Sequence, residues 1–332
     1  MAHIRFHCMS KEFLQSVVLG NELIQQENSW KEQVEGALDF HNRPKRQLSP
    51  QLRAMATPRR APNVLYLIGE ASTRVEMFDL EKGSCFPVDG MAQTTGAALV
   101  VEEELYTVMG GGLRIEKYDA KINAWTQVSA GVKESETAVC EGMGYIYVIG
   151  GNRRVKCFHV STRTWISLPH TKIRRSFHAV TTLLGKVYVI GGATLPGNVA
   201  IADVECYNPA ANCWVSVAPM RTERYRHQAA VLGGRLYVIG GTDQNLRPLK
   251  TVEVYEPTTN SWTFVSSLNV PRRDFGVGVL HGMIFVFGGS GSTNAIERYD
   301  NDTKKWTVIG ALSKRWSDVK CVSYPMIQIK CR

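Results

Sequence analysis

The fold of this chain is decided by a short stretch that reads Leu236-Tyr237-Val238-Ile239-Gly240-Gly241. A hydrophobic run that ends in glycine occurs six times, with its first glycine at Gly69, Gly110, Gly150, Gly191, Gly240 and Gly288. These glycines are separated by 41, 40, 41, 49 and 48 residues, a period typical of the blades of a β-propeller. The run is apolar throughout rather than alternating, which predicts a strand buried on both faces between two neighbouring blades.

A second marker follows each hydrophobic run. In five units an aromatic residue is followed seven positions later by tryptophan, as in Tyr118/Trp125, Phe158/Trp165, Tyr207/Trp214, Tyr255/Trp262 and Tyr299/Trp306. In the first unit Phe78 is followed at the same spacing by Cys85. The constant spacing predicts a tight turn between two paired strands, whereas the variable gap before the aromatic predicts a loop that tolerates insertion. Each unit is therefore expected to form four short strands.

Together these features resemble Kelch repeats, which share the diglycine, the spaced tryptophan and an aromatic followed by an acidic residue, as in Tyr118-Asp119 and Tyr299-Asp300. The resemblance covers about residues 62–329 and predicts an all-β fold, a six-bladed Kelch β-propeller over residues 62–332. WD-type repeats are disfavoured because no tryptophan here is followed by aspartate.

The first unit lacks an inner strand ahead of Leu65, whereas the tail from Ser317 to Ser323 resembles the inner strands of the other units. We therefore expect the C-terminus to return and complete the first blade. Such a closure removes the exposed edges that an open ring would present.

Residues 1–46 have a different character from the repeats. Ser29-Trp30-Lys31-Glu32 reads as a helical capping box, and prolines mark a linker over residues 47–61. The stretches 4–6, 9–14 and 37–41 resemble the C-terminal part of the helical BACK domain of BTB–BACK–Kelch proteins. In that family the BTB and BACK parts dimerise and hold the cullin scaffold of a ubiquitin ligase. The sequence contains no BTB segment, so we expect cullin binding only through a BTB/BACK region missing here.

Composition and charge indicate where the protein works and which kinds of partner it binds. No apolar run approaches the roughly 18 residues that span a bilayer, and none of the eight cysteines forms a C-x-x-C pair. Both observations favour an intracellular protein, cytoplasmic or also nuclear. The formal net charge of +9 favours acidic partners. The sequence has no stripe of Lys and Arg interleaved with aromatic residues, so nucleic acid is an unlikely partner.

In Kelch proteins, partner peptides bind the face built by the loops after the diglycine and the loops that lead into each inner strand. Counting back from the diglycine gives six equivalent positions in the second set: Thr94, Glu134, Arg175, Arg224, Arg272 and Arg315. The recurring arginine has two interpretations. It either pairs with neighbouring carbonyls or acidic side chains to hold the blades together, which we favour, or it forms a cationic crescent for carboxylates.

The residues after that arginine do not repeat, which makes them better candidates for a binding site. Tyr, Trp and Arg dominate binding hot spots, so Tyr225, Arg226, Arg273 and Trp316 are the main candidates. The full predicted set for partner binding is Arg175, Ser176, Phe177, Arg224, Tyr225, Arg226, Arg272, Arg273, Asp274, Arg315 and Trp316. His178 and His227 occupy the same place in two units and are expected to be structural. Long loops at 194–198 and 243–247 are expected to wall one side of the face.

No enzyme active site is predicted. The histidines are scattered, and neither a nucleophile elbow nor a phosphate-binding loop is present, so we expect no catalytic residue, metal or cofactor. The resemblance instead implies a protein-binding propeller that recognises protein or peptide substrates for a cullin-RING ubiquitin ligase. The alternative is a cytoskeletal, actin-associated scaffold, as some Kelch proteins are.

Overall fold

The computed structural model describes residues 64–69, 75–87, 97–108, 114–119, 122, 124–130, 137–290, 294–316 and 319–323. The chain divides into two compact units, Met1–Ala61 and Pro62–Arg332, and all described residues belong to the second. The helical segment predicted within residues 1–46, the linker at 47–61, Thr94 and Glu134 lie outside the described residues.

The described residues of the second unit form six antiparallel sheets of four strands each, with one additional two-stranded ladder, which confirms the predicted six-bladed propeller. Blade 1 is β26 (Val319–Ser323), β1 (Val64–Gly69), β2 (Val75–Asp79) and β3 (Ser84–Pro87). Blade 2 is β4 (Ala97–Val101), β5 (Glu104–Val108), β6 (Ile115–Asp119) and β7 (Ala124–Ser129). Blade 3 is β8 (Ala138–Gly142), β9 (Tyr145–Ile149), β10 (Val155–His159) and β11 (Thr164–Leu168).

The other three blades have the same order from the inner to the outer strand. Blade 4 is β13 (Ala179–Leu183), β14 (Lys186–Ile190), β16 (Val204–Asn208) and β17 (Cys213–Val217), with a short ladder of β12 (Arg175–Ser176) and β15 (Ala193–Thr194) at one end. Blade 5 is β18 (Gln228–Leu232), β19 (Arg235–Ile239), β20 (Val252–Glu256) and β21 (Ser261–Val265). Blade 6 is β22 (Gly276–Leu280), β23 (Met283–Phe287), β24 (Ala295–Asp300) and β25 (Lys305–Ala311).

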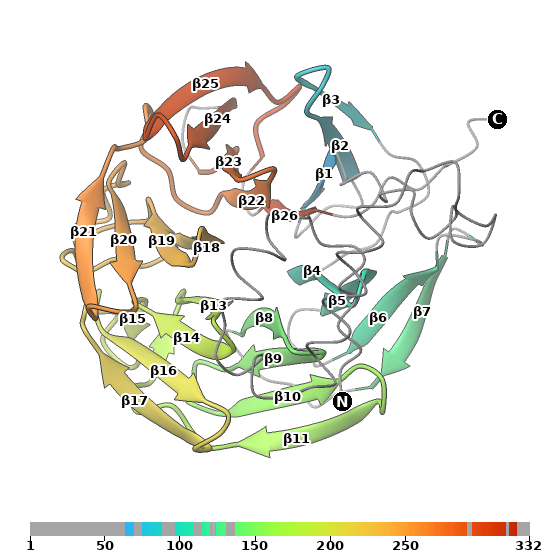
Figure 1. Ribbon diagram of the computed structural model, residues 1–332, viewed down its shortest axis with the longest axis vertical. Coiled ribbons are helices and arrows are strands. Elements are labelled where there is room, and N and C mark those ends of the chain that lie inside the picture. Colours follow the sequence, from blue (N-terminus) through green and yellow to red (C-terminus); the bar gives the residue numbers. More distant parts are fainter. Residues whose placement is uncertain are drawn as a thin grey trace, which may run out of the picture. The chain divides into compact units, whose positions relative to one another are not determined.

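The inner strands form a closed ring (Figure 1). Each contacts the next in the order β4, β8, β13, β18, β22 and β26, and β26 contacts β4 again. The outer strands β11, β17, β21 and β25 lie at the rim of the ring. A ring of this kind leaves no inner strand without a neighbour on either side.

The predicted return of the C-terminus is confirmed, because β26 pairs with β1 in antiparallel register from Leu65↔Ser323 to Gly69↔Val319. Glycines on the neighbouring β22 make room for this strand. A Cβ atom at Gly278 would lie 2.5 Å from the Sγ atom of Cys321, closer than real contacts allow. The side-chain-free backbone of β22 thus lets the closing strand pack tightly.

The diglycine allows close approach of the backbones of neighbouring blades. Gly240 and Gly241 have φ angles of +56° and +99°, which glycine adopts without strain. A Cβ at Gly240 would lie 2.7 Å from the carbonyl oxygen of Arg272, in the next blade. A side chain at this position would therefore force neighbouring blades apart.

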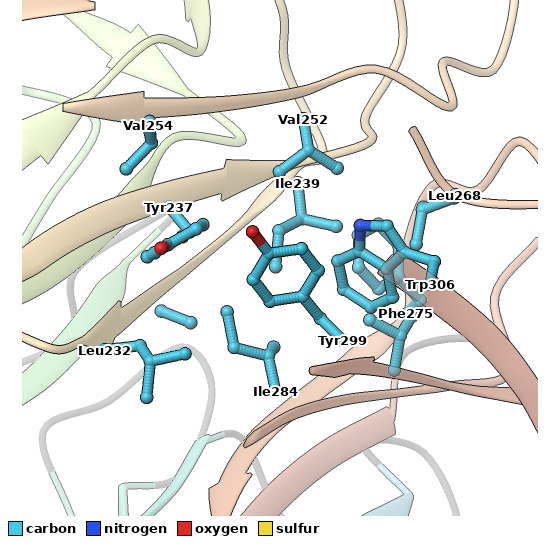
Figure 2. Close-up of a cluster of buried hydrophobic side chains, with 12 residues drawn as sticks. Leu232, Tyr237, Ile239, Val252, Val254, Leu268, Phe275, Ile284, Tyr299 and Trp306 are labelled. Atoms are coloured by element: carbon cyan, nitrogen blue, oxygen red, sulfur yellow. The ribbon is translucent and has the colours of Figure 1, made fainter. Parts of the chain in front are cut away.

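The spaced tryptophans join neighbouring blades. Trp262 pairs across the strands with Tyr255, with ring centroids 5.0 Å apart, and both rings pack against Leu183 and Tyr188 of blade 4. The indole Nε1 of Trp262 also donates to the carbonyl of Ala218 at 2.8 Å. Figure 2 shows the equivalent packing between blades 5 and 6, where Tyr299 and Trp306 meet the buried strands β19 and β20.

Candidate functional site

The recurring arginines form a buried polar frame inside blades 4, 5 and 6. Arg224 has no exposed surface. Its Nη1 donates to the carbonyls of Gly240 at 2.8 Å and Thr251 at 3.0 Å, and its Nη2 donates to Glu253 Oε1 at 2.6 Å. The pairs Arg175–Glu205 and Arg272–Glu297 repeat this arrangement, with Nη2–Oε1 distances of 2.6 and 2.9 Å.

Each glutamate also holds the segment that enters its blade from the preceding one. Glu253 Oε2 accepts from the backbone N–H of Arg221 at 2.6 Å, and Glu205 Oε2 accepts from that of Lys172 at 2.6 Å. Burial lowers the pKa of the Arg224 guanidinium, while Glu253 opposes that shift by favouring the charged form. The ion pair therefore fixes the base of the loop that leads into each inner strand.

This frame corrects part of the predicted binding set. Arg175, Arg224 and Arg272 are at most 1% exposed, so they support the loops from beneath and cannot contact a partner. The structural interpretation of the recurring arginine is the one that the geometry bears out. The hydrogen bonds of each guanidinium lie within one blade, however. The glutamate is the residue that binds the segment connecting this blade to the preceding one.

The glutamate itself was missed in the sequence, although its signal is present there. An acidic residue lies two positions before the repeated aromatic in five of the six units, at Glu76, Glu116, Glu205, Glu253 and Glu297. All five are buried, with at most 2% of their surface exposed. The third unit has Lys156 at this position. In blade 2, Arg114 pairs with Glu116, and in blade 1 the Ser313 hydroxyl donates to Glu76.

Two further predicted residues lie inside the protein. Trp316 is 8% exposed and packs in the core between blades 6 and 1 with Leu65 and Phe287. Trp316, predicted as a main candidate for partner binding, therefore lies in the core instead of on the surface, because closure of the ring buries it. Ser176 is fully buried, whereas Arg315 is exposed.

Three candidates with at least partly exposed side chains meet across three blades. Phe177, Arg226 and Asp274 occupy the same position after the buried arginines of blades 4, 5 and 6, with φ angles of +52°, +56° and +52°. The Arg226 N–H donates to the Phe177 carbonyl at 2.9 Å, and the Asp274 N–H donates to the Arg226 carbonyl at 3.3 Å. The Arg226 guanidinium lies over the Phe177 ring, 4.3 Å from its centroid, and pairs with Asp274 at 2.9 Å.

Loop residues extend this series at one end. Arg273 Nη1 lies 3.5 Å from the carbonyl oxygen of Leu246, and its Nε lies 4.0 Å from Asp274 Oδ2. The carboxylate of Asp243 accepts the backbone N–H groups of Asn245 and Arg247 at 2.9 and 2.8 Å, which shapes the loop. We call Phe177, Arg226, Asp274, Arg273 and Leu246 the recognition row.

The predicted long loops are held against one another beside the recognition row. The Gln244 side-chain oxygen accepts from the backbone N–H of Ala200 at 2.5 Å, which joins the loops of blades 4 and 5. Tyr225 lies under this junction in a small buried cluster with Ala193 and Ala200. Its ring centroid is 6.3 Å from that of Phe177. Tyr225, predicted as a main binding candidate, is only 8% exposed. It therefore packs beneath the surface residues and offers a partner little contact area.

His178 and His227 are buried beneath the same loops, in line with the structural role predicted for them. Burial lowers the pKa of both imidazoles to about 3, with a further contribution from Arg175 beside His178 and from Arg224 beside His227. Phe275 occupies the equivalent place in blade 6. Both histidines are therefore neutral in the folded protein near pH 7.

These two histidines are expected to make the propeller sensitive to acid. Their pKa is about 3 when folded and about 6.5 when unfolded. The unfolded state therefore binds more protons between those values, and the free energy of unfolding falls as pH is lowered below about 6.5. The maximum slope is about 1.4 kcal/mol per pH unit for each histidine. Urea unfolding between pH 7.5 and 4.5 measures this slope.

The double variant His178→Phe, His227→Phe is the matched control, because phenylalanine already fills this place in blade 6. In this variant the free energy of unfolding is expected to fall much less as pH is lowered. The remaining decrease is the part caused by protonation of carboxylates. An identical pH slope in wild type and variant would contradict the assignment.

Two features of other protein classes are absent from the described part of the chain. No group of three or more His, Cys, Asp or Glu side chains there could hold a metal ion. No helix among those residues is long and apolar enough to cross a membrane.

Comparison with known proteins places the repeats in a family. The family model described as "KLHDC2/KLHL20/DRC7 Kelch-repeats domain" matches residues 135–324, more than half of the chain. Kelch-like protein 28 of Mus musculus is 33% identical over 195 residues, which cover 57% of this chain and 30% of that protein. Kelch-like protein 28 of Homo sapiens is 31% identical over 204 residues, with the same coverage.

The chain thus spans less than a third of the length of these curated relatives. Among solved structures, one titled "Structure of YjhT" superposes with a TM-score of 0.50 at 17% identity, covering 55% of this chain and 67% of that one. At that identity the likeness concerns the fold alone. The chain therefore belongs to the Kelch-repeat family, whose β-propellers are protein-interaction domains.

Proposed function

We propose that this propeller recognises protein substrates for a cullin-RING ubiquitin ligase and that the recognition row is the surface that does so. The observation that carries the proposal is the contrast between the row and its base. Side chains that are at least partly exposed and differ from blade to blade stand on buried Arg–Glu pairs that repeat. Binding residues held by a rigid scaffold in this way lose little entropy when a partner binds.

The chemistry of the row suits a protein partner. Phe177 is 44% exposed and Leu246 65% exposed, and the Arg226 and Arg273 side chains are 35% and 34% exposed. Aromatic and arginine side chains that are partly packed and partly reachable are the kind that dominate protein–protein interfaces. They also lie on adjacent blades, so one extended segment of a partner can contact them together.

The ligase part of the proposal rests on two resemblances. The repeats are similar to Kelch-like protein 28 over the propeller, and residues 1–46 resemble the end of a BACK domain. In this proposal the propeller presents the substrate, and a BTB/BACK region recruits the cullin. The protein then works in the cytoplasm or nucleus, where such ligases assemble.

Proximity labelling in cells tests this proposal. A biotin ligase is fused at the endogenous locus, so that any sequence adjoining the chain is retained, and labelling is compared with and without a proteasome inhibitor. Partners labelled by the wild type but not by Phe177→Asn are expected to accumulate when the proteasome is inhibited, and a cullin is expected to co-purify. The control is Leu184→Asn, which changes another exposed residue at positive φ, at the opposite end of β13.

The ligase role is contradicted if the partners labelled by the wild type but not by Phe177→Asn fail to accumulate and no cullin is recovered. If those partners are actin or actin-bound proteins, the cytoskeletal role is supported instead.

A further inference from the structure

We infer that the face opposite the recognition row carries a second protein-binding surface, which takes a partner segment with two large apolar side chains and a Lys or Arg at one end of them. The surface is made by the turns that join the inner two strands of blades 2, 3 and 4. It consists of Glu102, Met143 and Leu184, which we call the turn strip. The strip is separate from the row, because the row residues precede the inner strands and these turns follow them.

The apolar residues of the turn strip have a backbone conformation that they do not favour. Met143 and Leu184 each precede a glycine in a two-residue turn, and both have a φ of +50°. Hairpin turns with positive φ at both positions favour Asn-Gly, because asparagine tolerates the left-handed region better than a bulky side chain does. Met143 is 59% exposed and Leu184 70% exposed, so burial within the protein does little to offset the strain. Exposed apolar side chains kept at strained positions point to contact with a partner.

The three side chains of the turn strip form one continuous surface. The inner strands that carry them contact one another in the order β4, β8 and β13. A Cβ atom added at Gly144 would lie 3.0 Å from the Oε1 atom of Glu102, and one added at Gly185 would lie 3.7 Å from the Sδ atom of Met143. Glu102 therefore reaches the turn of Met143, and Met143 reaches the turn of Leu184. A single partner segment can contact all three.

Open space lies beside Leu184, at the equivalent turn of blade 5. The inner strands of blades 4 and 5 contact each other, and the turn of blade 5 is Gly233-Gly234, which has no side chain. A Cβ atom added at either glycine would have no atom of a more distant residue within 4 Å. Leu184 therefore does not cover this turn in the way that Met143 reaches the turn before it. An apolar side chain of a partner can lie against Leu184 above the bare glycines, where it is partly removed from water.

The charges of the turn strip favour a basic residue at one end of the partner segment. Glu102 is exposed, and it forms no ion pair with any of the described residues. The carboxylate of Glu104, by contrast, is already paired with Lys117 at 3.2 Å. At the other end of the strip Lys186 is exposed at the start of β14, so a second cation there is unfavourable. One Lys or Arg beside Glu102, with apolar side chains along the rest of the strip, matches this distribution.

The charge of the whole chain does not attract such a segment. The formal net charge is +9, which repels a basic segment at a distance. Charges more than about 8–10 Å apart are largely screened at physiological salt, so Glu102 governs the contact itself. We therefore expect that burial of the apolar side chains drives binding and that the cation sets the orientation of the segment.

A selection from random peptides tests this inference on the purified full chain. A displayed library of sixteen-residue peptides is enriched on the protein, and the recovered peptides are synthesised with a fluorescent label and titrated by anisotropy. We expect a group of peptides that Leu184→Asn binds at least about tenfold more weakly than the wild type, while Phe177→Asn binds them equally well. The members of this group are expected to share a Lys or Arg and two large apolar residues.

Matched variants separate binding from folding. Met143→Asn is expected to weaken the same peptides about tenfold or more. Ile122→Asn is the control, because Ile122 is 67% exposed in the outer turn of blade 2, and it leaves the dissociation constant unchanged. Since asparagine favours the backbone of these turns, Met143→Asn and Leu184→Asn are expected to unfold at a urea concentration no lower than the wild type. A purely structural role for the two apolar side chains would instead lower that concentration.

A charge reversal tests the basic end of the segment. Glu102→Lys is expected to weaken the selected peptides. Replacing the cation of the peptide by glutamate is expected to weaken binding to the wild type and to restore binding to Glu102→Lys. Equal binding of each peptide to the wild type and to Glu102→Lys would contradict the contact between Glu102 and the cation.

Two further results would overturn the inference: no enriched peptide that depends on Leu184, or Leu184-dependent peptides without a Lys or Arg. A dimer of the chain seen by sedimentation velocity, and lost in Leu184→Asn, would assign the turn strip to a second copy of the chain instead. None of these results bears on the recognition row. Partners of the row are lost in Phe177→Asn and kept in Leu184→Asn, whereas partners of the strip show the opposite pattern.

Discussion

Replacing Glu253 by alanine is expected to lower the free energy of unfolding by about 3–5 kcal/mol. Glu253 is fully buried and pairs with the fully buried Arg224 at 2.6 Å. Its loss would leave a guanidinium without its counter-charge inside the protein, and the N–H groups of Arg221 and Thr222 would lose their acceptor. Urea unfolding followed by tryptophan fluorescence measures the change.

The matched control lies on the same blade. Arg235 and Glu256 form a pair of similar length, 2.8 Å, but their side chains are 49% and 32% exposed. Glu256→Ala is expected to change stability far less, because water replaces the lost partner. The double variant Arg224→Met, Glu253→Leu is expected to be more stable than Glu253→Ala alone, since it removes both buried charges. Equal losses for Glu253→Ala and Glu256→Ala would contradict the role given to the buried pair.

Removing the closing strand is expected to have the second large effect. Deleting residues 317–332 takes away β26, in which Val319 and Val322 are buried, and exposes the edge of β1 and the glycine-rich face of β22. The chain is expected to lose its single cooperative thermal transition and to associate through the open edges. Circular dichroism melting and size-exclusion chromatography measure the two effects.

A point substitution tests the same closure without shortening the chain. Gly278→Ala places a methyl group 2.5 Å from the Sγ of Cys321, whereas at Gly310, also on blade 6, the nearest atom to an added Cβ is 3.4 Å away. Overpacking of this kind costs about 1–3 kcal/mol, so Gly278→Ala is expected to melt well below Gly310→Ala. A truncated chain that melts like the full chain, or two equal glycine variants, would show that closure by β26 contributes little.

Much of the fold could be predicted because its signals are local. The diglycines, the aromatic-to-tryptophan spacing and the uninterrupted apolar runs each lie within about ten residues, the scale on which strands and turns are determined. The return of β26 was also predictable, since the first unit lacked an inner strand and the tail matched one. The buried glutamates could have been found by the same means, because they lie two positions before each repeated aromatic.

The candidate site was predictable only in part. Repetition correctly separated the structural arginines from residues that vary, and Phe177, Arg226, Arg273 and Asp274 do lie together. The repeat pattern does not predict which of these residues are buried. Trp316 is a main binding candidate in the sequence, yet it packs into the core where the ring closes.

The sequence by itself determined the number of blades, their order and the strands within them, because each blade is encoded by residues close together in the chain. Only the tertiary structure decided which loop residues meet. Arg226 and Asp274 are 48 positions apart, and their ion pair depends on the angle between two neighbouring blades. That angle is set by the packing of Tyr299 and Trp306 against the next blade, so no local pattern records it. The recognition row is therefore a product of the packing between blades, although Phe177, Arg226, Arg273 and Asp274 belong to the set predicted from the sequence and Leu246 to a loop predicted beside it.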